Sequence, residues 1–219
     1  MAISFDSITH TAYKNSTVNS QAHTFPSGSY GCLIGIFSTI DNITSVTVGG
    51  DAATLVDKLL MTGAAAGQYI HLYHYEGSTS GSRTVTVNSS SGLGGYFSIA
   101  TYNNVNETGQ PDASNKGGNS SATSLTVSLT TTENNCWLVG FAYTGATMSA
   151  GTGTTLRGGS VAGILSVIDS NGGITPAGSA GLTVTHSSNF DGMVMASFSP
   201  VPSAGGTTFR NNMLLSTGL

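Results

Sequence analysis

Charged side chains are scarce in this 219-residue chain. They make up 7% of it, against about a quarter in an average soluble domain. The six cations stand singly along the sequence, so there is no basic stripe to neutralise phosphates, and a net charge of -4 also argues against nucleic acid as a partner. Active sites usually gather ionisable groups, and the shortage of such groups makes an enzyme unexpected.

Long apolar runs and cysteines are scarce as well. No segment approaches the roughly 18 apolar residues of a membrane-spanning helix, so no membrane partner is expected. The first residues lack the basic and apolar regions of a secretory signal, and we expect synthesis in a cytoplasm. Cys32 and Cys136 lie in apolar segments. A disulfide between them would need adjacent strands and an oxidising compartment, and we expect buried free thiols instead.

Glycine, serine, threonine and asparagine are abundant and separate short segments of alternating or continuous apolar character. Such segments, bounded by turn residues, are typical of β-strands. The chain contains 13 of them: Ala22–Phe25, Tyr30–Ser38, Ile43–Val48, Ala53–Leu60, Tyr69–Glu76, Arg83–Asn88, Gly95–Tyr102, Ser124–Leu129, Cys136–Thr144, Thr154–Arg157, Ala162–Asp169, Leu182–His186 and Met193–Phe198.

These strands predict an all-β fold, which can be a β-sandwich, a jelly roll or a barrel, and we expect an antiparallel, jelly-roll-like β-sandwich over residues 1–200. Tyr30–Ser38 and Cys136–Thr144 are the most apolar strands, and we place them at the centres of the two sheets with Trp137 packed between them. Residues 103–122 show no periodicity and predict a long surface loop.

Residues 201–219 predict a linker followed by a C-terminal arm. The linker contains proline and glycine, and the arm carries apolar anchors at Phe209, Met213, Leu214 and Leu215. An extended chain advances about 3.3 Å per residue, so such an arm can reach a neighbouring subunit. The alternative is an arm that folds back on its own sandwich.

The segment Tyr69–Glu76 concentrates histidine and tyrosine. His71 and His74 are three residues apart and point to opposite faces of a strand, so they cannot share a metal ion. His74 and Glu76 share a face, but two ligands do not make a site, and we expect no metal or other cofactor. Partly exposed histidines beside tyrosines are the expected arrangement. If Tyr69, Tyr73 and Tyr75 are exposed they can stack on a glycan, whereas packing in the core is the default.

Hydrolytic sites have weak support. Serine is everywhere and five histidines are present (His10, His23, His71, His74 and His186), so a Ser-His-Asp arrangement can arise by coincidence, but there is no G-x-S-x-G motif before a helix. Carboxylate pairs such as Asp51 with Asp57, or Asp169 with Asp191, have nothing in the sequence to bring them together. The segment Asp169-Ser-Asn-Gly-Gly starts like a calcium loop but lacks the later glutamate, and predicts an Asx turn.

The order of the strand and turn motifs resembles a β-sandwich module of predicted bacteriophage virion proteins and some bacterial surface proteins. The similarity rests on Ala2–Asp6, Gly31–Phe37, Ile43–Val56, Tyr69–Tyr75, Arg83–Val87, Phe97–Val105, the loop around Gln110 and Pro111, and Gly192–Pro200. It spans residues 2–200 and implies one domain. The motifs contain no catalytic residues to carry over, and the module does not require the arm, residues 207–219.

The resemblance and the composition together imply a non-enzymatic virion structural protein, most simply a capsid decoration or cement protein on the virion surface. Its expected partners are further copies of itself, as a homotrimer or other homo-oligomer, and major capsid or tail proteins. A tail or fibre component is a close variant. The alternative is an adhesive carbohydrate-binding module that contacts surface glycans, and a hydrolase on the same scaffold is a third possibility.

Overall fold

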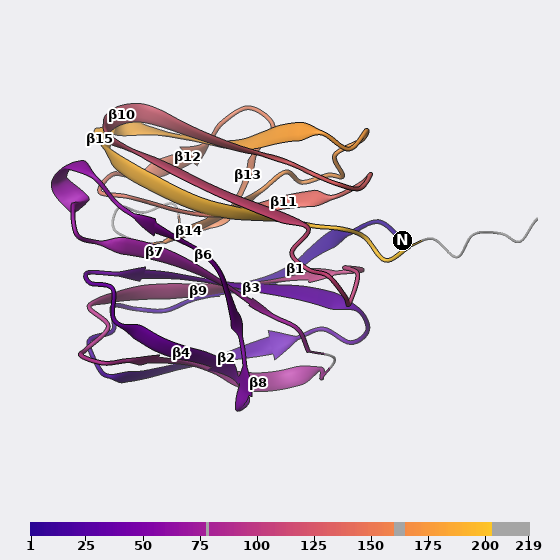
Figure 1. The fold of residues 1–219 in the computed structure, drawn as a ribbon, viewed down its shortest axis with the longest axis horizontal. Coiled ribbons are helices and arrows are strands. Elements are labelled where there is room, and N and C mark those ends of the chain that lie inside the picture. Colours follow the sequence, from indigo (N-terminus) through magenta and orange to yellow (C-terminus); the bar gives the residue numbers. More distant parts are fainter. Residues whose placement is uncertain (78, 160–164, 203–219) are drawn as a thin grey trace, which may run out of the picture.

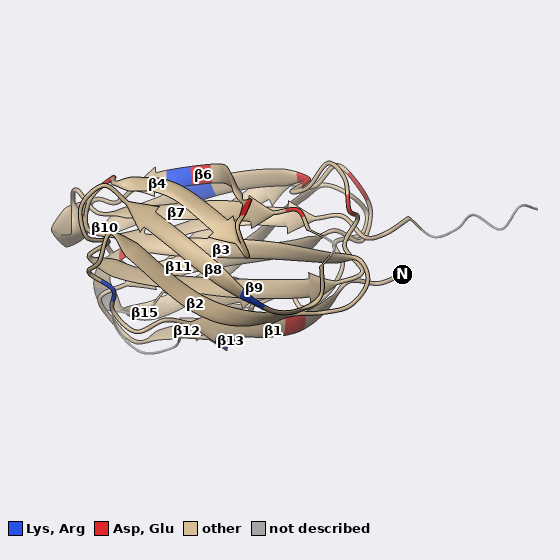
Figure 2. Cartoon of the chain, turned by 90° about the horizontal axis from the view of Figure 1, so that it is seen from below, with Lys and Arg blue, Asp and Glu red and all other residues tan. Residues whose placement is uncertain are grey.

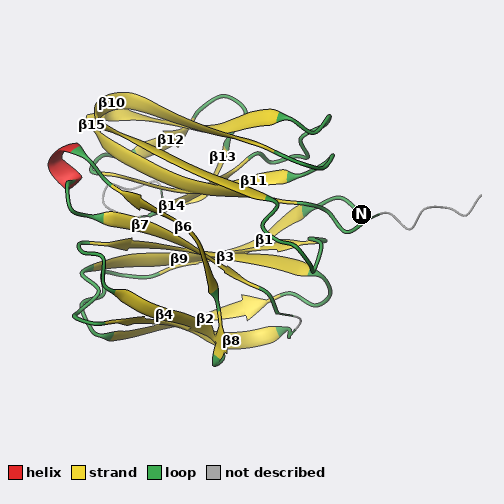
Figure 3. Cartoon of the chain, in the orientation of Figure 1, coloured by secondary structure: helices red, strands yellow, loops and turns green. Residues whose placement is uncertain are grey.

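The computed structural model describes residues 1–77, 79–159 and 165–202 and contains fifteen β-strands and one short 3-10 helix there (Figures 1 and 3). In chain order the elements are β1 (Ser4–His10), β2 (Val18–Phe25), β3 (Tyr30–Ser38), β4 (Ile43–Val48), β5 (Asp51–Ala52), β6 (Thr54–Leu60), η1 (Gly63–Ala65), β7 (Tyr69–Tyr75), β8 (Gly81–Ser89), β9 (Gly95–Asn103), β10 (Ala113–Thr130), β11 (Trp137–Thr144), β12 (Met148–Ala150), β13 (Thr155–Gly158), β14 (Ser166–Asp169) and β15 (Ser179–Phe198).

The strands form three antiparallel sheets stacked on one another. Sheet 1 has the order β2-β8-β4-β5, sheet 2 the order β1-β9-β3-β7-β6, and sheet 3 the order β10-β15-β11-β14-β13, with β12 also paired to β15. In Figure 1 they follow one another from bottom to top. The predicted all-β antiparallel sandwich is therefore confirmed, but it has three sheets where two were expected.

Strand β3 shows why the middle sheet is buried on both faces. Every residue of β3 is buried. Cys32, Ile34 and Ile36 pack in the core between sheets 1 and 2, whereas Leu33 and Phe37 pack in the core between sheets 2 and 3. Because successive side chains of a strand point to opposite faces, a continuous apolar run suits a strand covered on both sides. The predicted central position of this segment is confirmed.

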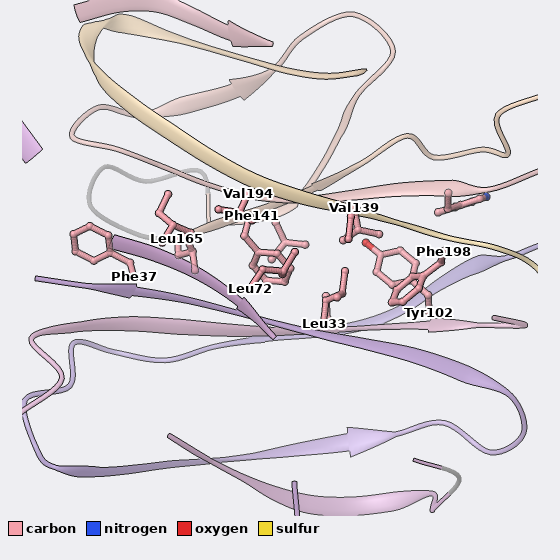
Figure 4. Close-up of a cluster of buried hydrophobic side chains, with 14 of the residues drawn as sticks. Leu33, Phe37, Leu72, Tyr102, Val139, Phe141, Leu165, Val194 and Phe198 are labelled. Atoms are coloured by element: carbon pink, nitrogen blue, oxygen red, sulfur yellow. The ribbon is translucent and has the colours of Figure 1, made fainter. Parts of the chain in front are cut away.

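Strand β11 has the same role in sheet 3. Val139 and Phe141 face sheet 2, where Figure 4 shows them among Leu33, Leu72 and Val194. Trp137 lies in the same core, with its ring centroid 5.9 Å from that of Tyr102, so its predicted place between the sheets is confirmed. Cys136 and Cys32 are both buried and free, as expected.

The long strands β10 and β15 pair along most of their length, and one half of this pair covers the outer face of sheet 3. Ala113–Asn119 of β10 pairs with Asp191–Ser197 of β15, and the register then shifts before Ser124–Thr130 pairs with Ser179–Thr185. Beyond this shift, apolar side chains of both strands pack against Leu138 and Met193 in a third core. A register shift bends a strand pair, so β10 and β15 can form part of sheet 3 and also fold over its outer face.

The prediction of a surface loop over residues 103–122 is wrong from Ala113 onward, because these residues begin β10. The segment Ala113–Asn119 pairs through its backbone with Asp191–Ser197. Most of its residues are small or polar, and none is buried, so they show no alternation of buried apolar side chains. Backbone pairing to a buried neighbour, which hydrophobic patterning cannot detect, makes this segment a strand.

Local turn chemistry agrees with the sequence. Gly49 and Gly50 have φ values of 59° and 100° and connect β4 to β5. Val48 at the end of β4 pairs with Asp51 at the start of β5. Two consecutive positive φ angles are those of a type I′ hairpin turn, which glycine adopts without strain. The Asx turn is also confirmed, because the Asn171 amide donates to Asp169 Oδ1 at 2.9 Å.

Sheets 2 and 3 are joined along both sides by contacts between their edge strands. On one side Lys116 of β10 donates to Asp57 of β6 at 2.7 Å. On the other side the Arg157 guanidinium of β13 lies 4.7 Å from the ring centroid of Phe5 of β1.

Across the described ranges, no helix has the length and apolar character needed to span a bilayer.

Candidate functional site

The charges of the described residues are distributed unevenly. Four of the five described lysines and arginines form ion pairs with an aspartate: Lys58 with Asp41, Arg83 with Asp51, Lys116 with Asp57 and Arg157 with Asp169. Six acids have no lysine or arginine within ion-pair distance among the described residues. Asp6 accepts hydrogen bonds from hydroxyls and Asp191 contacts His186, and the other four are Glu76, Glu107, Asp112 and Glu133. All four line surface cavities formed by loops at the same end of the stack.

This end of the molecule is where the N-terminus lies, and Figure 2 shows acidic segments in its loops. The N-terminal ammonium donates to the Val201 carbonyl at 3.2 Å, and Val105 bridges to Pro200. The carboxyl ends of β7 and β9 and the start of β3 meet here because these strands are paired in antiparallel register. Strand pairing thus gathers loops that are far apart in the sequence.

Two cavities at this end are both lined by His74 and Glu76. The first, of about 310 Å³, is completed by Tyr30, Gly77, Asn106, Glu107 and Thr108. The second, of about 440 Å³, lies toward β6 and the start of β10 and is completed by Thr54, Leu55, Val56, Gln110, Pro111, Asp112, Ala113 and Ser114. We refer to the first of these as the His74 cleft.

The imidazole of His74 is buried without a hydrogen bond. Its side chain is 5% exposed, and neither ring nitrogen has a hydrogen-bond partner among the described residues. Nδ1 lies 3.9 Å from Glu76 Oε1, and the ring centroid is 5.7 Å from that of Phe198. Burial lowers the pKa of His74 to about 4, so the ring is neutral near pH 7 and offers one donor and one acceptor nitrogen.

The remaining polar groups of the cleft differ in how firmly they are held. The Glu76 side chain is 58% exposed, and Glu107 accepts one hydrogen bond, from Ser29 Oγ at 3.0 Å. The Tyr30 hydroxyl donates to the Thr79 carbonyl at 3.1 Å. Glu76 and Glu107 are thus carboxylates with free hydrogen-bonding capacity at the mouth of the cleft.

Asp112, in the neighbouring cavity, uses its carboxylate for hydrogen bonds within the fold. Its carboxylate accepts hydrogen bonds from the Ser197 hydroxyl at 3.1 Å and from the Thr132 amide at 3.0 Å, and also from the Thr132 hydroxyl. The Cys136 thiol lies 3.6 Å from the same carboxylate. Burial, with a smaller contribution from Asp112, raises the pKa of Cys136 to about 12, so this thiol is unreactive.

The two histidines of β7 point to opposite sheets, as predicted, but the expectation that they are partly exposed is wrong. His71 is 2% exposed; its Nε2 lies 3.2 Å from Ser38 Oγ and 3.9 Å from Asp41 Oδ1. His74 faces sheet 3. Both rings are buried because β7 is covered on both faces. The described part of the chain contains no group of three metal-ligating side chains.

Three histidines come close to hydroxyls or carboxylates without forming a catalytic triad. His23 Nδ1 contacts Thr9 Oγ1 at 2.8 Å, and the nearby Asp6 carboxylate accepts from Ser7 and Thr101 rather than from the imidazole. His10 Nδ1 contacts Ser98 Oγ at 2.7 Å.

The third, His186, places Nε2 3.1 Å from Asp191 Oδ2, but its Nδ1 faces the Ser187 carbonyl. Among the described residues, no histidine holds a carboxylate on one ring nitrogen and a serine hydroxyl on the other. A Ser-His-Asp triad needs that arrangement.

The proposed tyrosine row for glycan stacking is corrected by the structure. Tyr73 and Tyr75 are buried in the core between sheets 1 and 2, so they cannot stack on a sugar. Tyr69 is half-buried, and the Lys58 Nζ lies over its ring, 5.6 Å from the Tyr69 ring centroid. Core packing, the default interpretation, holds for two of the three rings.

The outer face of sheet 1 is a surface that sequence reasoning did not identify. We call it the hydroxyl face, and it consists of Val18, Ser20, Ala22, Thr24, Ser45, Thr47, Ser82, Thr84, Thr86 and Asn88. Cross-strand hydrogen bonds join Ser20 to Thr86 at 3.1 Å and Asn88 to Ser45 at 2.9 Å. None of its residues is charged, and Figure 2 views the molecule from this side.

This face could have been identified from the alternation in the β8 sequence, where Val85 and Val87 point inward and Thr84 and Thr86 outward. The cleft could not, because Tyr30, His74 and Glu107 are more than 30 residues apart in sequence. The predicted arm residues Phe209, Met213, Leu214 and Leu215 lie outside the described residues.

Comparisons with known proteins add no family. A scan of protein-family models, a search of curated protein sequences and a search of solved structures each produced no match to this chain.

Proposed function

We propose that the chain is a non-catalytic structural subunit of a bacteriophage virion, most simply a capsid decoration or cement protein that assembles with neighbouring subunits. The observation that carries the assembly role is the free edge of sheet 1. Strand β2 ends this sheet and contains no Lys, Arg, Asp, Glu or proline in its eight residues.

The other strands at the ends of the three sheet orders all carry charge, and β12, a three-residue strand paired only to β15, is the uncharged exception. Asp6 lies in β1, Asp51 in β5, Asp57 and Lys58 in β6, Lys116 in β10 and Arg157 in β13. Charged residues on edge strands prevent pairing with the edge of another molecule. Strand β2 lacks this protection, which favours a role in contacts between subunits.

The hydroxyl face adjoins this edge and supports the same role. Interface cores are depleted in charged residues, because an unpaired charge is costly to remove from water. Serine and threonine hydroxyls can donate and accept, so they can exchange water for hydrogen bonds to many partner surfaces. The virion setting is supported by the resemblance of the sequence motifs, and the expected arm supplies a second, independent contact.

The assembly role is tested by lysine substitution on β2. Ala22→Lys places a charge on the exposed side of the edge strand, and Ser124→Lys places one on an exposed position of β10, on the opposite side of the stack. Light scattering after size-exclusion chromatography should show an oligomer for the unaltered chain and Ser124→Lys, and monomers for Ala22→Lys. A monomeric unaltered chain, or equal effects of the two substitutions, would contradict assembly through β2.

The virion setting is tested by immunogold electron microscopy of phage particles from the producing culture, with antibodies against this chain. Gold on the capsid supports a decoration protein, and gold on the tail supports the tail or fibre variant. Particles free of gold would overturn the virion proposal while leaving the assembly result to stand by itself. The alternative of an adhesive carbohydrate-binding module has lost the Tyr73 and Tyr75 platform, because both rings are buried.

A further inference from the structure

We infer that the His74 cleft is a binding site for one cationic side chain, a guanidinium or primary ammonium group presented by a partner protein. The inference concerns the loop end of the stack and does not depend on the assembly role of β2 or on the virion setting. It rests on three features of the cleft: its two carboxylates without a lysine or arginine partner, the imidazole of His74 in its lining, and its size.

The carboxylates provide the charge. Glu76 and Glu107 both line the cleft, and neither has a lysine or arginine partner among the described residues. Arg83 is held on the sheet 1 side by Asp51 and by the Tyr75 hydroxyl, so its charge is already compensated. Two uncompensated carboxylates in one concave site favour a cation and disfavour an anion.

The imidazole provides a polar group that lines the cavity. The His74 side chain is 5% exposed, and its ring nitrogens have no hydrogen-bond partner among the described residues. The fully buried side-chain atoms without a hydrogen-bond partner among the described residues are His10 Nε2 and Asn42 Oδ1, so the His74 nitrogens keep access to the cavity. A neutral imidazole can accept a hydrogen bond from an N–H donor of a bound guanidinium or ammonium group, which would satisfy it.

The donor geometry favours an organic cation over a metal ion. No group of three metal-ligating side chains exists in the described ranges, so His74 and Glu76 cannot complete a coordination shell with protein ligands. A guanidinium carries five N–H donors and can meet several acceptors at once. Asn106 and Thr108 add neutral oxygens to the lining, and a cavity of about 310 Å³ admits a single long side chain.

The test uses small probes with the full chain. Nα-acetyl-arginine amide and Nα-acetyl-lysine amide carry the two cationic side-chain groups. Nα-acetyl-citrulline amide has nearly the shape of the arginine probe without its charge. NMR titration follows the ring signals of His74. We expect saturable shifts with the two cationic probes at millimolar concentration, and binding of the citrulline probe at least tenfold weaker.

Variants locate the site. Glu76→Gln and Glu107→Gln should each weaken arginine-probe binding about fivefold or more, because each removes one carboxylate from the cleft. Glu133→Gln is the matched control, since Glu133 lies at the same end but lines a different cavity. It should change binding less than twofold. Far-ultraviolet circular dichroism checks that each variant is folded, and the exposed positions of Glu76 and Glu107 make this the expected result.

Several results would overturn the inference. Equal binding of the citrulline and arginine probes would show that charge is not recognised. Equal loss in Glu76→Gln and Glu133→Gln would show diffuse attraction to an acidic end rather than a site. Tighter binding of calcium chloride or of methyl α-glucoside than of the arginine probe would assign the cleft to a metal ion or a sugar. The absence of any shift at His74 would exclude the site.

Discussion

The ring of Phe141 on β11 occupies the space over the α-carbon of Gly35 on β3, so the middle strands of sheets 2 and 3 are in direct contact at these two residues. A Cβ atom on Gly35 would overlap the Phe141 ring. Figure 4 shows Phe141 near Leu72 and Val194, with which it shares the core between sheets 2 and 3. The close approach of the two sheets therefore depends on glycine at position 35.

Gly35→Ala should destabilise the protein by about 1–3 kcal/mol, because overpacking a filled core forces neighbouring groups to shift. Urea unfolding measures the change. Gly172→Ala is the control: the atom nearest to its added Cβ is the Ser170 carbonyl oxygen, 3.9 Å away. Equal losses in the two variants would contradict the importance of the Gly35–Phe141 contact.

The buried ion pair between Arg157 and Asp169 should be more important for stability than the exposed pairs. Asp169 is fully buried and accepts from Arg157 Nε at 2.7 Å and from the Tyr102 hydroxyl at 3.0 Å. Arg157→Met leaves the carboxylate buried without its cation, which should cost about 3–5 kcal/mol.

Lys58→Met is the matched control for Arg157→Met. The Lys58–Asp41 pair is just as short, at 2.6 Å, but its two side chains are 37% and 40% exposed. Water screens such a pair, so its removal should cost no more than about 1 kcal/mol. The comparison of the two denaturation midpoints checks the prediction, and a larger loss in Lys58→Met than in Arg157→Met would refute it.

Stability should fall as the pH drops below about 6.5. Burial lowers the pKa of His23, His71 and His74 to about 4, although Asp6 and Asp41 partly oppose this at His23 and His71. Between pH 6.5 and 4 the unfolded chain therefore binds more protons than the folded one, and protonation favours unfolding. The expected loss between pH 7.5 and 5 is on the order of 2 kcal/mol per histidine.

Urea titrations across this pH range measure the loss. His71→Gln should flatten the slope by the share of one histidine, and its Ser38 contact gives glutamine a place to hydrogen-bond. Lys116→Gln, which removes a charge and leaves the three histidines in place, should keep the full slope. A stability that is constant from pH 7.5 to 5 would contradict the neutral state of the three rings.

Deletion of residues 207–219 should leave the sandwich folded. The three cores consist of residues between Ile3 and Phe198, so the midpoint of urea unfolding should not change. If the deleted segment is the predicted arm, the apparent mass of the assembly on size-exclusion chromatography should fall. An unchanged assembly would remove the arm from the proposed function.

Much of the fold could be predicted because strand patterning is local. The apolar run of β3 indicated a central strand, and the segment that starts at Asp169 indicated an Asx turn; both are found. The start of β10 was missed, because Ala113–Asn119 becomes a strand through backbone pairing to β15, which leaves no mark on its side chains. The third sheet was missed because alternation does not show which strands pair.

The sequence by itself determined the fold class, the central strands, the buried thiols and the low density of charge. These follow from side-chain type and spacing, which act over a few residues. Tertiary structure alone decided where the few charges lie. Ion pairs with distant aspartates compensate four of the cations, and antiparallel pairing brings Glu76 and Glu107 to one cleft around His74. Four acids without a lysine or arginine partner thus line cavities at one end of the stack, because long-range strand pairing sets the position of the loops that carry them.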